Sequence, residues 1–158
     1  MIGKRRPLGK ELKDIQIGDN YSETKKVVDR DLLLYLGLTN DANPLYLQHD
    51  YASLTPYKRP IVPAVMLFGM VSSLVSMHLP GPGSHITHHE IIFTKPVYHN
   101  TEVYFTLEVI AIDEANQRIA MNVTGKDEKG DEVITGKLYV IPASRPNTLT
   151  AQSLENFF

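Results

Sequence analysis

Cysteine is absent from the 158 residues of this chain. Without a thiol, the protein has no disulfide bond, no thiolate nucleophile and no sulfur ligand for a zinc ion. Disulfides are typical of oxidising compartments and rare in the reducing cytoplasm. A chain of this size that contains none therefore fits the cytoplasm.

The chain also lacks a large excess of one charge and a long uninterrupted apolar run. Sixteen lysine and arginine residues nearly balance eighteen aspartate and glutamate residues, which gives a net charge of -2. This balance favours neither nucleic acid nor an anionic membrane as a partner. The longest apolar stretch, 61–77, is interrupted by Pro63, Gly69 and several serines, so it predicts a buried helix instead of a membrane span. The N-terminus has no apolar run of the signal-peptide kind, and we expect a cytoplasmic protein.

The order of helical and strand patterns indicates an α+β fold. An apolar stripe after Asp29 predicts a helix that Gly37 ends, and a short helix is expected over 45–54. Residues 62–79 are apolar nearly all round, which is typical of a helix covered on most sides. One edge strand is expected over 22–28. Four further strands are expected at 85–95, 102–112, 117–126 and 132–141. These segregated patterns predict an antiparallel sheet wrapped around one long helix.

The length of the chain suits a single domain. We expect this domain over 19–142. An irregular N-terminal segment is expected at 1–18, and a C-terminal tail that leaves the sheet is expected at 143–158.

Four short motifs give a more specific indication. Residues 39–46 read Thr-Asn-Asp-Ala-Asn-Pro-Leu-Tyr, and residues 59–66 read Arg-Pro-Ile-Val-Pro-Ala-Val-Met. Leu-Pro-Gly-Pro-Gly-Ser follows at 79–84, and Phe-Thr-Lys-Pro-Val at 93–97. Together they resemble the MaoC-like, (R)-specific enoyl-CoA hydratase family, in the order that this family shows. The resemblance extends over 17–141 and implies the hot-dog fold, in which an antiparallel sheet wraps around a central helix.

The resemblance also implies a site that adds water to a trans-2-enoyl thioester. In the family, an aspartate and a histidine hold the water, and an amide at the start of the central helix stabilises the enolate-like oxygen. A carboxylate beside an imidazole takes and returns a proton near neutral pH, and the amides at a helix start favour negative charge. In this chain Asp41 matches the carboxylate, and Asn43 follows it two residues later in the motif. Ala64 matches the residue that supplies the helix-start amide.

Two positions depart from the family pattern. Tyr46 occupies the place of the histidine, and a phenol, with an ordinary pKa of about 10, is a poor base near neutrality but still donates a hydrogen bond. Pro63 and Ala64 replace a His-Gly pair; Ala64 keeps its amide, whereas Pro63 has none. We therefore expect Asp41 as the base, Tyr46 as the group that orients the water and the Ala64 amide as the oxyanion donor.

Other residues are expected near the substrate or in place of the missing imidazole. The expected substrate-binding residues are Asn43, Val65, Ser72 and His89. Alternation along the predicted strand places His85 and His89 on one face and His88 on the other, and His89 is the best candidate for a replacement imidazole. Solvent-facing strand histidines are the commoner arrangement. His49 lies three residues after Tyr46, and the two side chains would share a face if both residues lay on one continuous helix. We expect no cofactor and no metal site, because no cluster of carboxylates completes a ligand set.

Three functions stay open. The first is a diverged hydratase or dehydratase acting on an acyl thioester of coenzyme A or acyl carrier protein. The second is a non-catalytic acyl-thioester binding protein, or the inactive subunit of a heteromeric dehydratase, which the loss of both motif histidines favours. The third is a hot-dog thioesterase. An isolated sheet of this kind leaves an edge open, so a homodimer or higher oligomer is expected, with a heteromer as the alternative.

Overall fold

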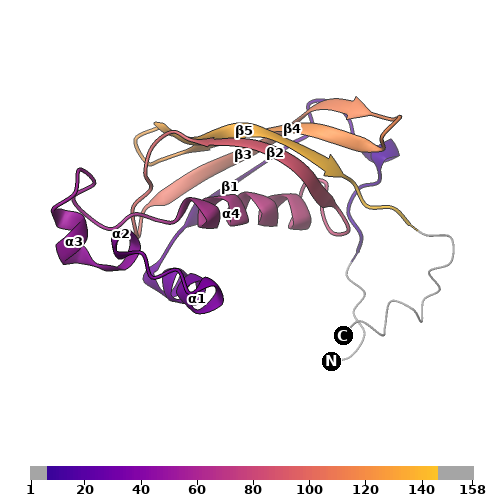
Figure 1. Ribbon diagram of the computed structural model, residues 1–158. Coiled ribbons are helices and arrows are strands. Elements are labelled where there is room, and N and C mark those ends of the chain that lie inside the picture. Colours follow the sequence, from indigo (N-terminus) through magenta and orange to yellow (C-terminus); the bar gives the residue numbers. More distant parts are fainter. Residues whose placement is uncertain (1–6, 146–158) are drawn as a thin grey trace.

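The computed structural model describes residues 7–145. Its centre is a five-stranded antiparallel sheet in the order β1-β3-β4-β5-β2, which curves over the long helix α4 (Figure 1). The strands are β1 (Asn20–Lys26), β2 (His85–Phe93), β3 (Glu102–Asp113), β4 (Arg118–Lys126) and β5 (Glu132–Ile141). The helices are α1 (Asp29–Thr39), α2 (Pro44–Leu47), α3 (His49–Ser53) and α4 (Ala64–Met77), with a short 3-10 helix at Leu12–Asp14. This arrangement confirms the predicted α+β class.

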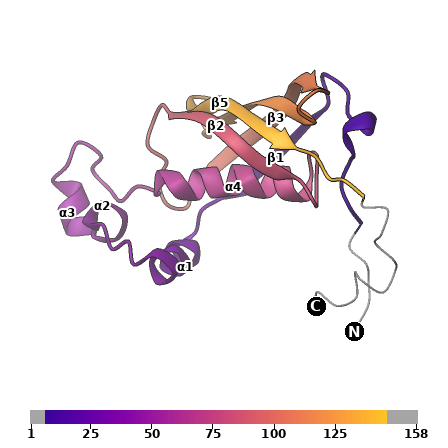
Figure 2. The same cartoon turned by 45° about the vertical axis from the view of Figure 1, so that its right-hand side comes forward.

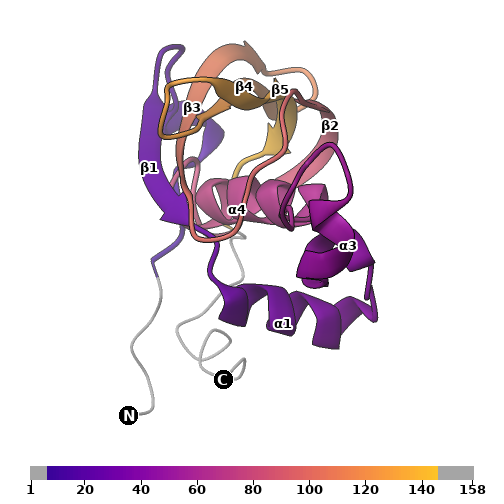
Figure 3. The same ribbon diagram turned by 90° about the vertical axis from the view of Figure 1, so that its left-hand side faces the viewer.

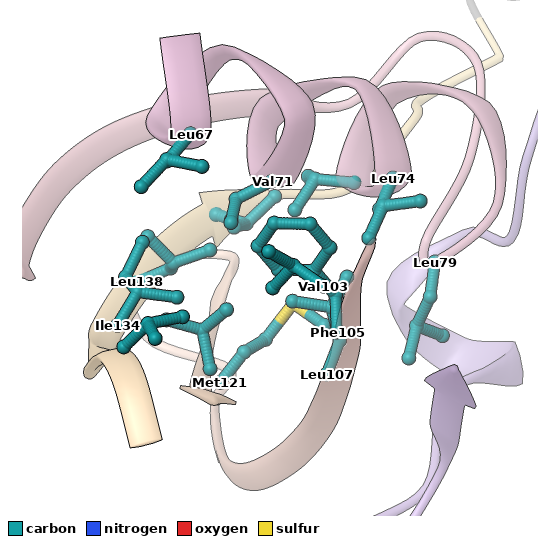
Figure 4. Packing of buried hydrophobic residues seen from close by; sticks show 14 of the residues in the cluster. Leu67, Val71, Leu74, Leu79, Val103, Phe105, Leu107, Met121, Ile134 and Leu138 are labelled. Atoms are coloured by element: carbon teal, nitrogen blue, oxygen red, sulfur yellow. The ribbon is translucent and has the colours of Figure 1, made fainter. Parts of the chain in front are cut away.

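Apolar side chains of α4 and of the inner face of the sheet form the core (Figure 4). On α4, Leu67, Val71 and Leu74 are buried, at the three- and four-residue spacing that keeps side chains on one face of a helix. Alternate residues of the strands meet them, among them Phe105 and Leu138, which are fully buried. Burial of this apolar surface is the main source of stability of the fold.

Helices α1, α2 and α3 form an arm, residues 29–53, beside one end of α4 (Figures 2 and 3). The prediction that Gly37 ends α1 is wrong, because the helix continues to Thr39. Asn40 then takes a left-handed conformation with φ of 56°, and its amide donates to the Leu36 carbonyl at 2.8 Å. Asparagine adopts this conformation more readily than most residues, whereas a glycine inside a helix is tolerated at a cost of about 1 kcal/mol. The stop signal is therefore Asn40.

The short helix predicted over 45–54 is divided in two. Gln48 is extended, with φ of -109° and ψ of 107°, so that α2 ends at Leu47 and α3 begins at His49. The three-residue spacing that would place His49 on the same face as Tyr46 applies only within one helix. The expectation that these two side chains share a helix face is therefore wrong.

Strand β2 carries a β-bulge that changes where its histidines point. Its register against β5 shifts between Ile86 and His88. A bulge adds one residue to a strand and interrupts the alternation between the two faces of the sheet. His89 consequently pairs with the buried Leu138 and lies on the inner face, whereas His85 and His88 pair with residues of β5 on the outer face. The predicted common face for His85 and His89 is wrong.

The segment before β1 is attached to the loop after α4. The amides of Gly9 and Lys10 donate to the carbonyls of Pro82 and Pro80 at 2.8 and 2.9 Å. Residues 1–6 of the expected N-terminal segment and residues 146–158 of the expected C-terminal tail lie outside the described residues. Over the described part of the chain, none of the helices is long and apolar enough to span a membrane.

Candidate active site

Asp41 lies in a tight turn directly after α1. The Asp41 amide donates to the Thr39 hydroxyl at 3.2 Å, and the Asn43 amide donates to Asp41 Oδ1 at 3.3 Å. Side-chain-to-backbone bonds of this kind replace the backbone bonds that a helix would supply. The turn at Asn40 therefore ends α1 and at the same time presents a half-buried carboxylate.

Tyr35 on α1 also binds Asp41. Its hydroxyl donates to Asp41 Oδ2 at 2.9 Å. The hydrogen bond to the carboxylate, followed by burial, raises the pKa of Tyr35 above the ordinary value of a phenol. Tyr35 was not among the predicted site residues, since its hydroxyl reaches a residue six positions later only because the chain turns at Asn40. The one local signal was a hydroxyl-bearing aromatic in the last two turns of a helix that leads to the motif.

Asn43 starts α2 and so positions Tyr46. Its side-chain oxygen accepts the amide of Leu45 at 3.0 Å, and Pro44 occupies the first helical position, where a missing N–H costs nothing. The Tyr46 side chain is half-buried and lies near enough to the Tyr35 phenol to contribute to its raised pKa. The structure thus places Asp41, Asn43 and Tyr46 on one turn and the short helix that follows it, and Tyr35 binds to Asp41 from α1.

The start of α4 is joined to α2 through the backbone. The Ile61 amide donates to the Leu45 carbonyl at 3.0 Å, and the Val62 amide donates to the Val97 carbonyl at 2.7 Å. Pro63 is extended and Ala64 is the first helical residue, so that α4 begins two residues later than predicted. The amides in the first turn of a helix have no partner within it and point outward along the axis. The Ala64 amide therefore suits an oxyanion donor.

Two grooves run along different faces of α4. The β2-side groove, of about 530 Å³, is lined mainly by serine and histidine residues together with Phe68, and includes Ser72, Ser76 and His89. The α1-side groove, of about 520 Å³, is lined largely by apolar residues and includes Leu34, Tyr35, Leu38, Met66 and Met70. The ring of His89 packs edgewise against Phe68, with 4.3 Å between the ring centroids. Of the predicted residues, Ser72 and His89 therefore share the first groove. Tyr35, which was not predicted, lines the second.

No group of three or more histidine, aspartate or glutamate side chains within residues 7–145 is arranged to hold a metal ion. The chemistry available at the site is that of a carboxylate, two phenols and the amides of a helix start. These groups can hold a water molecule, move a proton and stabilise an oxyanion.

Comparison with known proteins identifies the family. The family model described as "MaoC like domain" matches residues 14–130. The chain belongs to the MaoC-like family. It is 29% identical over 132 residues to the (R)-specific enoyl-CoA hydratase of Rhodospirillum rubrum, a match that covers 84% of this chain and 91% of that protein.

Solved structures of MaoC-like proteins have the same fold. The R-hydratase PhaJ1 from Pseudomonas aeruginosa superposes with a TM-score of 0.80 at 24% identity, over 87% of this chain and 88% of that one. The ChsH1-ChsH2 complex from Mycobacterium tuberculosis gives a TM-score of 0.72 at 20% identity, over 80% and 98% of the two chains. The prediction of a hot-dog fold is therefore confirmed.

Proposed function

We propose that this MaoC-like protein is an enoyl-thioester hydratase that adds water to trans-2-enoyl thioesters and, in reverse, dehydrates 3-hydroxyacyl thioesters. The observation that carries the proposal is the Asp41 carboxylate, held by Tyr35 and Asn43 on a loop that is tied through Leu45 to the segment preceding α4. A base and an oxyanion donor on connected elements are what the reaction requires. The hydratases and dehydratases among the relatives support this choice.

Asp41 is the base in this proposal. It accepts a proton from a water molecule that the Tyr46 hydroxyl orients, while the water oxygen forms a bond to C3 of the enoyl chain. The electrons of the double bond shift to the thioester oxygen, and the Ala64 amide donates a hydrogen bond to this developing enolate. Asp41 then returns the proton to C2, which completes the 3-hydroxyacyl thioester.

The acyl chain is proposed to follow the side of α4 that starts at the Ala64 amide and faces the β2-side groove. Val65 is 65% exposed, and Ser72, which lines the groove, lies seven residues further on, two helical turns along the same side of α4. His89 borders the same groove from β2. In this arrangement Val65, Ser72 and His89 bind the acyl portion, and Asn43 supports the loop that carries the base.

A second copy of the chain is the proposed partner. Strand β2 is at the edge of the sheet and pairs only with β5 within the described residues, and its Ile92 is 63% exposed. An open edge with apolar side chains is a template for pairing with another strand. Light scattering on the purified protein is expected to give twice the chain mass of 17.8 kDa. A monomer at working concentration would contradict the homodimer, and activity only after addition of a second MaoC-like protein would favour the heteromer.

Hydration of crotonyl-CoA by the purified protein tests the function. Loss of the enoyl absorbance, with (R)-3-hydroxybutyryl-CoA as the product, is the expected result. The Tyr46→His variant is expected to be faster, because an imidazole is a better base near neutral pH than a phenol. A wild type that is inert on both coenzyme A and carrier-protein thioesters, together with an active Tyr46→His variant, would contradict the proposal and favour an acyl-thioester binding protein. Release of free thiol from an acyl-CoA would instead favour a thioesterase.

A further inference from the structure

Tyr35 connects the α1-side groove with the Asp41 carboxylate. Its side chain lines the groove between α1 and α4, and its hydroxyl donates to Asp41 Oδ2 at 2.9 Å. The phenol is half-buried, and with an ordinary pKa of about 10 it is protonated and able to donate at neutral pH; the hydrogen bond to the carboxylate raises the pKa of Tyr35 further. The bond to Asp41 is therefore built into the resting site.

The two oxygens of Asp41 are held in different ways. Oδ1 accepts the amide of Asn43, two residues along the same turn, at 3.3 Å. Oδ2 accepts the Tyr35 hydroxyl, which is fixed on the preceding helix. A bond within the turn moves with the turn, whereas the bond to Tyr35 fixes the carboxylate relative to α1. Each carboxylate oxygen has two acceptor positions, so a water molecule can still bind.

We propose that Tyr35 is a positioning residue, which holds Asp41 in the direction needed to take a proton from water. This inference rests on the proposed hydratase function. It follows from the residue at position 46, because a phenol there is a poor base and leaves the proton transfer to Asp41 alone. A lone base must be aligned with its water, and a misplacement of about 1 Å costs about 100-fold in rate. The Tyr35 hydroxyl supplies that alignment.

The Tyr35→Phe variant removes the hydroxyl and keeps the ring that lines the groove. We expect kcat for crotonyl-CoA to fall about 100-fold, with KM within about twofold and a melting temperature lower by a few degrees at most, because only one partly exposed hydrogen bond is lost. The matched control is Tyr51→Phe, which makes the same change at an exposed position on α3 and is expected to retain full activity. The double variant Tyr35→Phe/Asp41→Asn is expected to be no slower than Asp41→Asn alone, because Tyr35 acts through Asp41.

The outcomes separate this inference from the function on which it rests. If the wild type is active, Asp41→Asn is inactive and Tyr35→Phe keeps full kcat, the inference fails and the hydratase function stands. If Tyr35→Phe loses activity only in proportion to a lower melting temperature, or if the double variant is slower by the product of the two single effects, Tyr35 has a structural or independent role and the inference fails. A wild type that is inert on enoyl thioesters overturns the function, and the role of Tyr35 with it.

Discussion

The body of the molecule, made of the sheet and α4, and the arm of α1 to α3 are built in opposite ways. In the body, alternate residues of the central strands are completely buried against α4. In the arm, α1 buries only Leu32, α3 buries only Ala52, and α2 buries none of its residues. Leu38 in the arm and Leu54, the residue directly after it, are each 86% exposed. The arm nevertheless holds Asp41, the proposed base, so the proposed chemistry and the main source of stability lie in different parts of the chain, as is usual for segments that bind ligands.

The largest effect on stability is expected in the body. Phe105→Ala removes a fully buried ring from the face that packs on α4 and is expected to lower the free energy of unfolding by about 3–5 kcal/mol. Tyr104→Ala, at the neighbouring residue on the outer face with half of its surface exposed, is the control and should cost less than about 1 kcal/mol. Urea unfolding measures both variants. Equal losses would show that the body does not depend on its inner face.

The next largest effect is expected on activity, with stability nearly unchanged. Ala64→Pro removes the helix-start amide, and proline fits the first position of a helix, so the fold is expected to tolerate it. We expect kcat to fall by about 10²–10³-fold, the usual loss of one oxyanion donor, while the melting temperature moves by a few degrees at most. Ala64→Gly keeps the amide and serves as the control. Full activity of Ala64→Pro would exclude this amide as the donor.

A smaller effect distinguishes the two grooves of α4. Ser72 lines the β2-side groove and Ser73 the α1-side groove, so the same change at adjacent residues fills one groove or the other. Ser72→Leu is expected to raise KM for long-chain enoyl-CoA roughly tenfold, with little change for crotonyl-CoA, and Ser73→Leu to have less effect. Steady-state kinetics with the two chain lengths measures this. The reverse order would place the acyl chain in the α1-side groove.

The smallest effect is a shift in the ionisation of Tyr35. Because the carboxylate of Asp41 raises the pKa of Tyr35, the folded protein holds this proton more tightly than the unfolded chain does. This tighter binding of the Tyr35 proton contributes to the free energy of unfolding. The contribution is fully present below about pH 10, the ordinary pKa of a phenol, and is lost as the pH rises through the raised pKa of Tyr35. The difference in tyrosinate absorbance between wild type and Tyr35→Phe reports this titration. In the Asp41→Asn background the titration should occur at lower pH, and an unchanged titration would mean that the bond is absent in solution.

The body was more predictable from the sequence than the arm. A helix that is apolar all round and strands that alternate are direct consequences of burial, and both were found where expected, with α4 trimmed by Pro63. The predictions that were wrong concern places where a single residue or a one-residue insertion decides the direction of the backbone. Asn40 and not Gly37 ends α1, Gln48 divides the second helix, and a bulge turns His85 away from His89.

The candidate site was only partly predictable. Asp41, Asn43 and Tyr46 lie in one motif, and their proximity follows from the turn that the motif forms. Tyr35 lies outside the motif, and its contact with Asp41 depends on the direction in which the chain leaves α1 at Asn40. No periodicity in the sequence encodes that direction. The proposed pairing of β2 with a second copy would likewise be a property of two chains, which a single sequence indicates only through an open edge.

Asp41→Asn in the crotonyl-CoA assay, with the melting temperature measured on the same preparation, tests most directly whether the arm carries the chemistry that the body supports. Asparagine keeps the size of the side chain and an oxygen for the Tyr35 hydroxyl, but it does not accept a proton from water. We expect kcat to fall about 10³-fold, with a melting temperature within a few degrees of the wild type. Retention of wild-type activity, or a loss of activity that merely follows unfolding, would contradict the role of Asp41 as the base and the proposal that the arm carries the catalytic carboxylate.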